Sequence, residues 1–163
     1  MKKRRLSILL SIVMLFSLLP TTALAAAYPD HVRVFNESGT ITSLSDGQYL
    51  AANNASNAST GYDGSQTYVA RYDQSSGKLY LRDYHGTATH DMIFADGDLN
   101  IEVESDSSFT TSTTATGNLY GIRADGGKLN ISGSGKLTVT ANGSGNVYGI
   151  SAKRASQSPH RWL

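Results

Sequence analysis

Acidic residues are the first groups in this sequence to consider for catalysis, because a carboxylate can serve as a general acid or base. Seven of them, between positions 83 and 125, are candidates for such a role: Asp83, Asp91, Asp96, Asp98, Glu102, Glu104 and Asp125. Asp96 and Asp125 stand at predicted turns, where aspartate is common because its side chain hydrogen-bonds to nearby backbone. We therefore predict that the chain is not an enzyme.

The other residues that could support catalysis or bind a cofactor also do not indicate an active site. His85 and His90 lie near Asp91, but the three have no recognised metal-ligand spacing. No serine stands in a Gly-x-Ser-x-Gly setting. The chain has no cysteine, which excludes thiolate catalysis, zinc–thiolate sites and iron–sulfur clusters. We predict no catalytic residue, no metal site and no cofactor.

Tyrosines are the remaining candidates for ligand contact, because an aromatic face can stack on a sugar ring. The chain has nine tyrosines. Those in the first half include the predicted glycan contacts Tyr72, Tyr80 and Tyr84. The alternative is that they are half-buried strand residues, which is the usual position of tyrosine in a sheet. Tyr120 and Tyr148 recur at the same place in a repeat and are interpreted as a structural stack.

The N-terminus has the pattern of a secretory signal peptide. Four basic residues at positions 2–5 precede an apolar run of 14 residues, 6–19, and Pro20 ends that run. Ala23 and Ala25 supply the small-x-small pattern of a cleavage site, so cleavage after Ala25 is predicted, with Ala27 as second choice. Because a membrane-spanning helix needs about 20 apolar residues, we predict a secreted or cell-surface protein without a membrane span after cleavage.

The net charge of the chain changes when this segment is removed. The whole chain carries a formal charge of +1, but residues 28–152 hold 7 basic and 13 acidic residues. Nucleic-acid binding requires a positive surface. We therefore predict that nucleic acid is not a partner.

A sequence repeat indicates the architecture. "GNLYGIRA", which begins at Gly117, and "GNVYGISA", which begins at Gly145, match at six of eight positions. A shorter phrase, Gly-(Lys or Asp)-Leu-x-(Ile, Leu or Val), begins at Gly77, Gly97, Gly127 and Gly135. Its two apolar residues flank one variable residue, as expected of a strand with one buried face.

Three short strands and three turns fit into one 28-residue unit, which is the content of one coil of a parallel β-helix. The strands are expected at residues 119–124, 128–132 and 136–140, separated by glycine-rich turns. An antiparallel β-sandwich is the competing architecture, but its strands need not resemble one another as these do. The predicted inward stacks are Met92/Ile122/Ile150, Leu99/Leu129, Ile101/Ile131, Phe109/Leu137 and Thr111/Val139.

We therefore predict an all-β chain that forms a short right-handed parallel β-helix of about two to three coils with an N-terminal β cap. The signal peptide occupies residues 1–25. The cap occupies 28–87, with strands at 32–35 and 47–50, and the coils occupy 88–152 with a period of 28–30 residues. Residues 153–163 break the repeat, because "KRASQSPHRWL" lacks the glycine and leucine that the next turn and strand require. They are predicted to be a poorly ordered, foreign tail from a frameshift or truncated reading frame.

Three segments together resemble a family of exported repeat proteins of Gram-positive bacteria with pectin-lyase-like β-helix coils, often labelled carbohydrate-binding-domain-containing. They are "YVARYDQSSGKLYLRDYHG" from Tyr68, "IFADGDLNIEVESDSSF" from Ile93, and "GNLYGIRADGGKLNISGSGKLTVTANGSGNVYGISA" from Gly117. The resemblance implies the N-terminal fragment of a secreted cell-surface repeat protein with an adhesive or scaffolding role. The second reading is a carbohydrate-binding module with cell-wall or host glycans as partners. The third is a polysaccharide-active enzyme that uses carboxylates on one outer face.

Overall fold

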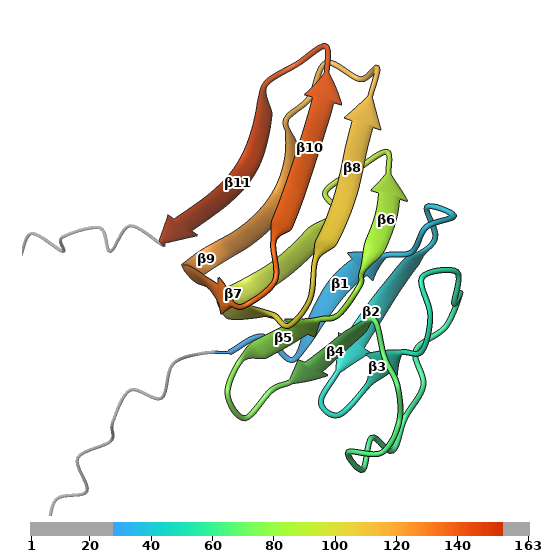
Figure 1. Cartoon of the computed structure of the whole chain (residues 1–163). Coiled ribbons are helices and arrows are strands. Elements are labelled where there is room, and N and C mark those ends of the chain that lie inside the picture. Colours follow the sequence, from blue (N-terminus) through green and yellow to red (C-terminus); the bar gives the residue numbers. More distant parts are fainter. Residues whose placement is uncertain (1–27, 155–163) are drawn as a thin grey trace, which may run out of the picture.

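The computed structural model describes residues 28–154 and shows an all-β fold, as predicted. Eleven strands form one eight-stranded sheet and one three-stranded sheet, and the described residues contain no helix (Figure 1). Consequently, nothing within residues 28–154 resembles a helix able to cross a membrane. The predicted signal peptide, with its cleavage residues Ala23 and Ala25, lies outside the described residues, as do residues 155–163 of the predicted tail.

The first four strands pair in antiparallel fashion. They are β1 (His31–Phe35), β2 (Ile41–Ser45), β3 (Tyr49–Leu50) and β4 (Ala70–Asp73). β1 pairs with β2, and β3 pairs with β4. The two strands expected in this region at 32–35 and 47–50 are present, although the second is shorter. β2 was not predicted. The two residues that it buries are Thr42 and Leu44, so only one of them is strongly apolar and the sequence pattern is weak.

The later strands pair mainly in parallel. They are β5 (Lys78–Leu81), β6 (His85–Ala88), β7 (Ile93–Val103), β8 (Ser107–Thr113), β9 (Leu119–Gly133), β10 (Leu137–Gly143) and β11 (Val147–Arg154). In the large sheet β5, β7, β9 and β11 follow one another in parallel, and β4 joins β5 in antiparallel fashion. β6, β8 and β10 form the small parallel sheet, which stacks against the large one (Figure 1).

The strand register confirms part of the predicted strand pairing. Val147 pairs with Leu119 and Ile150 with Ile122, so the two matching segments lie side by side in the predicted register. Leu99 pairs with Leu129 and Ile101 with Ile131, also as predicted.

Three of the predicted pairings are wrong in register. Ile93, not Met92, pairs with Ile122, which makes this offset shorter by one than predicted. Phe109 pairs with Val139 rather than with Leu137, and Thr111 pairs with Ala141 rather than with Val139. β8 and β10 are thus offset by 30 residues, which is more than predicted. The offset varies from one strand pair to the next, and a single value taken from the sequence cannot describe them all.

Two of the four glycines that open the repeated phrase, Gly97 and Gly127, lie within continuous strands. The predicted strands at 119–124 and 128–132 form one strand, β9, which bends at Gly126 with a φ of 76°. A Cβ atom added at Gly127 would lie 2.0 Å from the carbonyl carbon of Gly97 in the layer below. Because a side chain does not fit between two backbones this close, glycine is required at the bend.

The hydrophobic core lies between the two sheets and extends under the antiparallel strands. The side chains of Leu79, Leu99 and Ile101 in the large sheet are fully buried, and Phe109 of the small sheet is almost fully buried. The last layer is different, because Ile131 and Ile150 are 40% and 52% exposed. Burial therefore decreases from the N-terminal end of the stack to the C-terminal end.

Parallel pairing extends into the segment predicted as the N-terminal cap, residues 28–87. β5 pairs in parallel with β7, and β6 with β8. The offset of this first layer is shorter, with 23 residues between His85 and Ser108. Because this offset is shorter than the predicted period of 28–30 residues, the pairing of these strands cannot be recognised from that period.

The inward assignment of Ile122 can be tested by mutation. Ile122→Asp places a charge at a fully buried position, so we expect the free energy of unfolding to fall by about 3 kcal/mol or more, or folding to fail. Asn130→Asp changes an exposed side chain that donates one hydrogen bond to Asn100, and should cost less than about 1 kcal/mol. Chemical denaturation measures both values, and equal effects would contradict the assignment.

Candidate functional site

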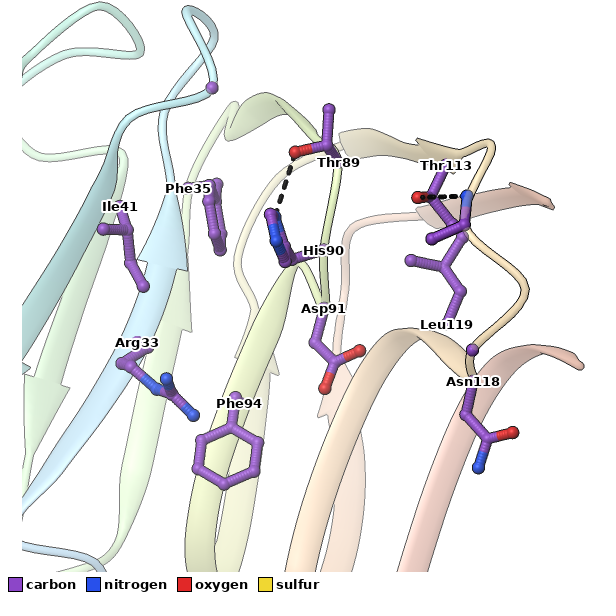
Figure 2. A pocket seen from close by; sticks show the side chains of 13 residues that line it. Arg33, Phe35, Ile41, Thr89, His90, Asp91, Phe94, Thr113, Asn118 and Leu119 are labelled. Atoms are coloured by element: carbon purple, nitrogen blue, oxygen red, sulfur yellow. Dashed lines mark hydrogen bonds between the residues drawn. The ribbon is translucent and has the colours of Figure 1, made fainter. Parts of the chain in front are cut away.

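A groove of about 590 Å³ lies where the β1–β2 hairpin meets the loops of the parallel layers. Figure 2 shows Arg33 and Ile41 on the hairpin side, Asn118 and Leu119 on the opposite side, and His90 between them. A concave, mostly apolar site with a few polar groups is the usual form of a small-ligand site. The groove is therefore the first candidate functional site.

Arg33 and Asp91 line the groove, and Arg123 lies beside it. The Arg33 guanidinium carbon lies 4.0 Å from the centroid of the Phe94 ring, and Arg123 approaches the same ring at 5.4 Å. Arg123 also pairs with Asp91 at 3.6 Å and with Asp125 at 2.6 Å. Asp91 is therefore compensated, whereas Arg33 makes no ion pair within residues 28–154.

The loops around the groove are positioned by hydrogen bonds between layers. The Asp91 carboxylate accepts the Tyr120 backbone N–H at 3.1 Å, and the Thr111 hydroxyl donates to the His90 carbonyl oxygen. The Asn118 side chain accepts from Asn146 at 3.1 Å. His90 is exposed, and its Nδ1 lies 2.9 Å from the Thr89 hydroxyl. The groove thus presents donors and acceptors on a fixed backbone.

Asp83, His85 and Ser108 form a hydrogen-bonded chain that the sequence analysis missed. His85 Nδ1 lies 2.8 Å from the Ser108 hydroxyl, and His85 Nε2 lies 3.1 Å from the Asp83 carboxylate. Ser108 is 23 residues from His85 and meets it only because β6 and β8 pair in parallel. A short-range motif could not have revealed it.

This chain of three residues lacks the surroundings of a catalytic triad. The side chains of Asp83 and His85 are 76% and 45% exposed, so water screens the charges that would activate the serine. None of the three lines the groove. Instead, the backbone of Asp83 (φ 51°) donates to the Ser105 hydroxyl and accepts from the Asn53 amide. These three hydrogen-bonded residues thus help to hold the turn at Asp83, which joins the two sheets.

Two of the three predicted glycan contacts are core residues. The rings of Tyr72 and Tyr84 are fully buried. The Tyr72 hydroxyl donates to the Pro29 carbonyl oxygen at 2.6 Å, and the Tyr84 hydroxyl donates to the Phe35 carbonyl oxygen. Neither ring can reach a sugar in this structure, and the prediction for these two residues is corrected. A tyrosine ring is apolar and packs well at an inward strand position when its hydroxyl forms a hydrogen bond. Both hydroxyl groups do so here, each with a backbone carbonyl oxygen.

The third predicted contact, Tyr80, is half-buried and belongs to a cluster around Arg71. The Arg71 guanidinium carbon lies 4.0 Å from the ring centroid of Tyr80, 4.5 Å from that of Tyr62 and 5.5 Å from that of Tyr68. Arg71 Nε is buried and has no hydrogen-bond partner in the described part of the chain. Because the guanidinium lies over one face of Tyr80, that face cannot stack on a sugar.

Most of the candidate carboxylates bind this chain's own groups. Glu102 pairs with Lys78 at 3.3 Å and Glu104 with Arg82 at 2.8 Å. Asp98 accepts the backbone N–H of Lys128 in the next layer at 2.8 Å. No group of three or more metal-ligating side chains occurs within residues 28–154. The carboxylates therefore mainly connect neighbouring strands and layers.

Comparison of the chain with family models, with curated proteins and with solved structures gave no match.

The buried tyrosines predict the response of the fold to alkaline pH. Burial raises the pKa of Tyr72 to about 12, and burial together with the hydrogen bond to Glu104 raises the pKa of Tyr68 to about 12. Burial also raises the pKa of Tyr84. Since an unfolded tyrosine has a pKa of about 10, these neutral phenols stabilise the fold fully below pH 10, and we expect that contribution to be lost as the pH rises toward 12.

The near-ultraviolet absorbance of tyrosinate and circular dichroism, recorded in one alkaline titration, measure this effect. We expect late-titrating tyrosines whose ionisation coincides with unfolding, and Tyr72→Phe should reduce their number by one. Ionisation of all nine tyrosines near the ordinary value while the fold stays intact would contradict the burial of these rings.

Proposed function

We propose that the parallel layers are coils of a short right-handed β-helix and that the chain is a secreted, cell-surface repeat scaffold with an adhesive role. The observation that carries the proposal is the equivalence of successive layers. β7, β9 and β11 pair in parallel at closely similar offsets, and like residues stand on like residues. Equivalent asparagines hydrogen-bond across 28 residues at Asn146 and across 30 residues at Asn130.

Side-chain ladders on the outside of the stack support this proposal. The rings of Tyr120 and Tyr148 stack with centroids 5.0 Å apart and planes within 13° of each other. The Asn130 amide donates to Asn100 at 2.8 Å. Such ladders add a rigid, regular outer surface at each layer, and repeat proteins use surfaces of this kind for binding. The N-terminal signal pattern and the negative body charge agree with a surface role.

Export is the first test of this proposal. When the whole chain is expressed in a Gram-positive host with a C-terminal epitope tag, we expect the tag outside the cytoplasm and an intact mass that lacks residues 1–25. Ala25→Lys should block processing, because it removes the small residue both from the cleavage site after Ala25 and from the second choice after Ala27. Thr22→Lys is the matched control and should be processed.

Retention of the unprocessed wild-type chain in the cytoplasm would contradict a secreted role. Adhesion is then measured by the retention of bacterial cells on beads coated with the processed chain. Beads that carry the Ile122→Asp variant serve as the control, since that variant loses the buried stack. Equal retention on both kinds of bead would contradict the adhesive role.

A carbohydrate-binding module is the second candidate function, and the groove is the observation that favours it. It combines an arginine without an ion-pair partner in the described chain, an exposed histidine and an exposed amide, set beside the apolar surface of Ile41. These groups match the hydroxyl groups and the apolar ring face of a sugar.

The groove predicts which substitutions would weaken glycan binding. On an array of cell-wall and host glycans, we expect Asn118→Ala and His90→Ala to reduce the signal by roughly tenfold each, the loss of one or two hydrogen bonds. Tyr80→Ala, on the tyrosine cluster outside the groove, should leave the signal unchanged. The reverse result would assign binding to the tyrosine cluster, and an array without any signal would remove the second candidate.

A further inference from the structure

The Arg33 guanidinium is held over an aromatic ring at the wall of the groove. Arg33 and Phe94 are cross-strand partners in the antiparallel pair of β1 with β7. The guanidinium carbon lies 4.0 Å from the centroid of the Phe94 ring, and Figure 2 shows the Arg33 side chain extended toward that ring. A guanidinium that lies over an aromatic face keeps the N–H donors at its edge available for a ligand.

The positive charge of Arg33 is not balanced by the other charged group of the groove. Of the lysine, arginine, aspartate and glutamate side chains in the described chain, only Arg33 and Asp91 line the groove. The Asp91 carboxylate pairs with Arg123 at 3.6 Å and accepts the Tyr120 backbone N–H at 3.1 Å. Arg33 makes no ion pair within residues 28–154. A cation of this kind in a recess is complementary to an anionic group on a ligand.

A single arginine favours a carboxylate over a phosphate as that anionic group. The planar fork of a guanidinium matches the two oxygens of a carboxylate, whose single negative charge it balances. A phosphate monoester carries about two negative charges, and proteins hold it with clusters of arginines or with the N-terminus of a helix. Residues 28–154 contain no helix, and the Asp91 carboxylate in the same groove would repel a second negative charge.

The other groups of the groove fit the remainder of a sugar. His90 Nδ1 lies 2.9 Å from the Thr89 hydroxyl, which leaves Nε2 for a ligand. Asn118 lies on the opposite side of the groove from Arg33 (Figure 2). Its side chain makes one hydrogen bond as donor and one as acceptor to neighbouring residues, so one amide proton remains. Ile41, which is 48% exposed, adds apolar surface for a ring face.

We propose that the groove binds a sugar that carries a carboxylate, a uronic acid or sialic acid residue of a glycan, with the carboxylate on Arg33. This inference rests on the proposed carbohydrate-binding function and adds the class of sugar. The Arg33 guanidinium donates to both carboxylate oxygens, and hydroxyl groups of the sugar face His90 and Asn118. Residues 28–152 hold 7 basic and 13 acidic residues, so the body of the chain does not attract anions. Recognition of the carboxylate therefore depends on direct contact with Arg33.

Calorimetric titration of the processed chain with matched pairs of glycans tests the proposal. The probes are a hyaluronan oligosaccharide, which contains glucuronate, and sialyllactose. Each is compared with its carboxyl-reduced form, which differs only by the loss of the carboxylate. We expect an acidic glycan to bind about tenfold or more tightly than its reduced form, which is the effect of a charge-assisted hydrogen bond. The acidic probe that binds identifies the source of the carboxylate.

Three variants show whether Arg33 is responsible for this difference. Arg33→Gln should abolish the preference for the acidic form, and Arg33→Lys should retain only part of it, because an ammonium group lacks the planar fork. Arg82→Gln is the matched control, since it removes the same charge from a residue that pairs with Glu104 and does not line the groove. It should bind as the wild type does. Arg33 is only half-buried, so all three variants should keep the β-type circular dichroism spectrum.

Two kinds of result would overturn the proposal, and they differ in what else they remove. If glycans bind with Asn118→Ala weakening them but with no effect of carboxyl reduction or of Arg33→Gln, the groove binds neutral sugars, and only the acidic class is wrong. If no glycan in either form binds, in the titration or on the array, the carbohydrate-binding function is wrong as well.

Discussion

Parallel pairing between successive layers is the constraint on which the rest of this structure depends. In the parallel strands from β5 to β11, the backbone N–H and C=O groups bond mainly to the neighbouring strands, about 4.8 Å away. Paired residues of neighbouring strands therefore lie side by side. Where two backbones approach closely at a bend, as at Gly127 over Gly97, a side chain does not fit. Outside the stack the same spacing brings tyrosine onto tyrosine and asparagine onto asparagine.

This constraint also uses most of the chemically active side chains. Carboxylates accept backbone N–H groups of the next layer or pair with arginines and lysines on neighbouring strands, and the inward tyrosines donate to backbone carbonyl groups. Such groups are already occupied and have little freedom to act on a ligand. Open polar groups gather where the layering is interrupted, at the junction between the β1–β2 hairpin and the loops that precede β7 and β9. That is where the groove lies.

The two ends of the stack differ for a related reason. At the N-terminal end the strands change from parallel to antiparallel pairing, and this change lets a short hairpin and β4 cover the edge. At the C-terminal end the last described layer continues the repeat without a change of direction. Within residues 28–154, no strand pairs beyond β10 and β11, and Ile150 is 52% exposed.

The sequence by itself determined the all-β fold, the pairing of the two matching segments and the absence of cysteine chemistry, because these follow from composition and from a period that is visible along the chain. It did not determine the register at Ile93 or at Phe109, since bends and loops of different length change the offset between layers. Nor could it separate Tyr72 and Tyr84, which are buried, from Tyr80, which is half-exposed, because alternation along a strand does not tell which face another sheet covers. Only the tertiary structure decided which tyrosines are buried. It also brought Ser108 to His85 and Arg33 to Phe94. Residues of different strands meet because the strands pair, and their spacing in the sequence does not predict such contacts.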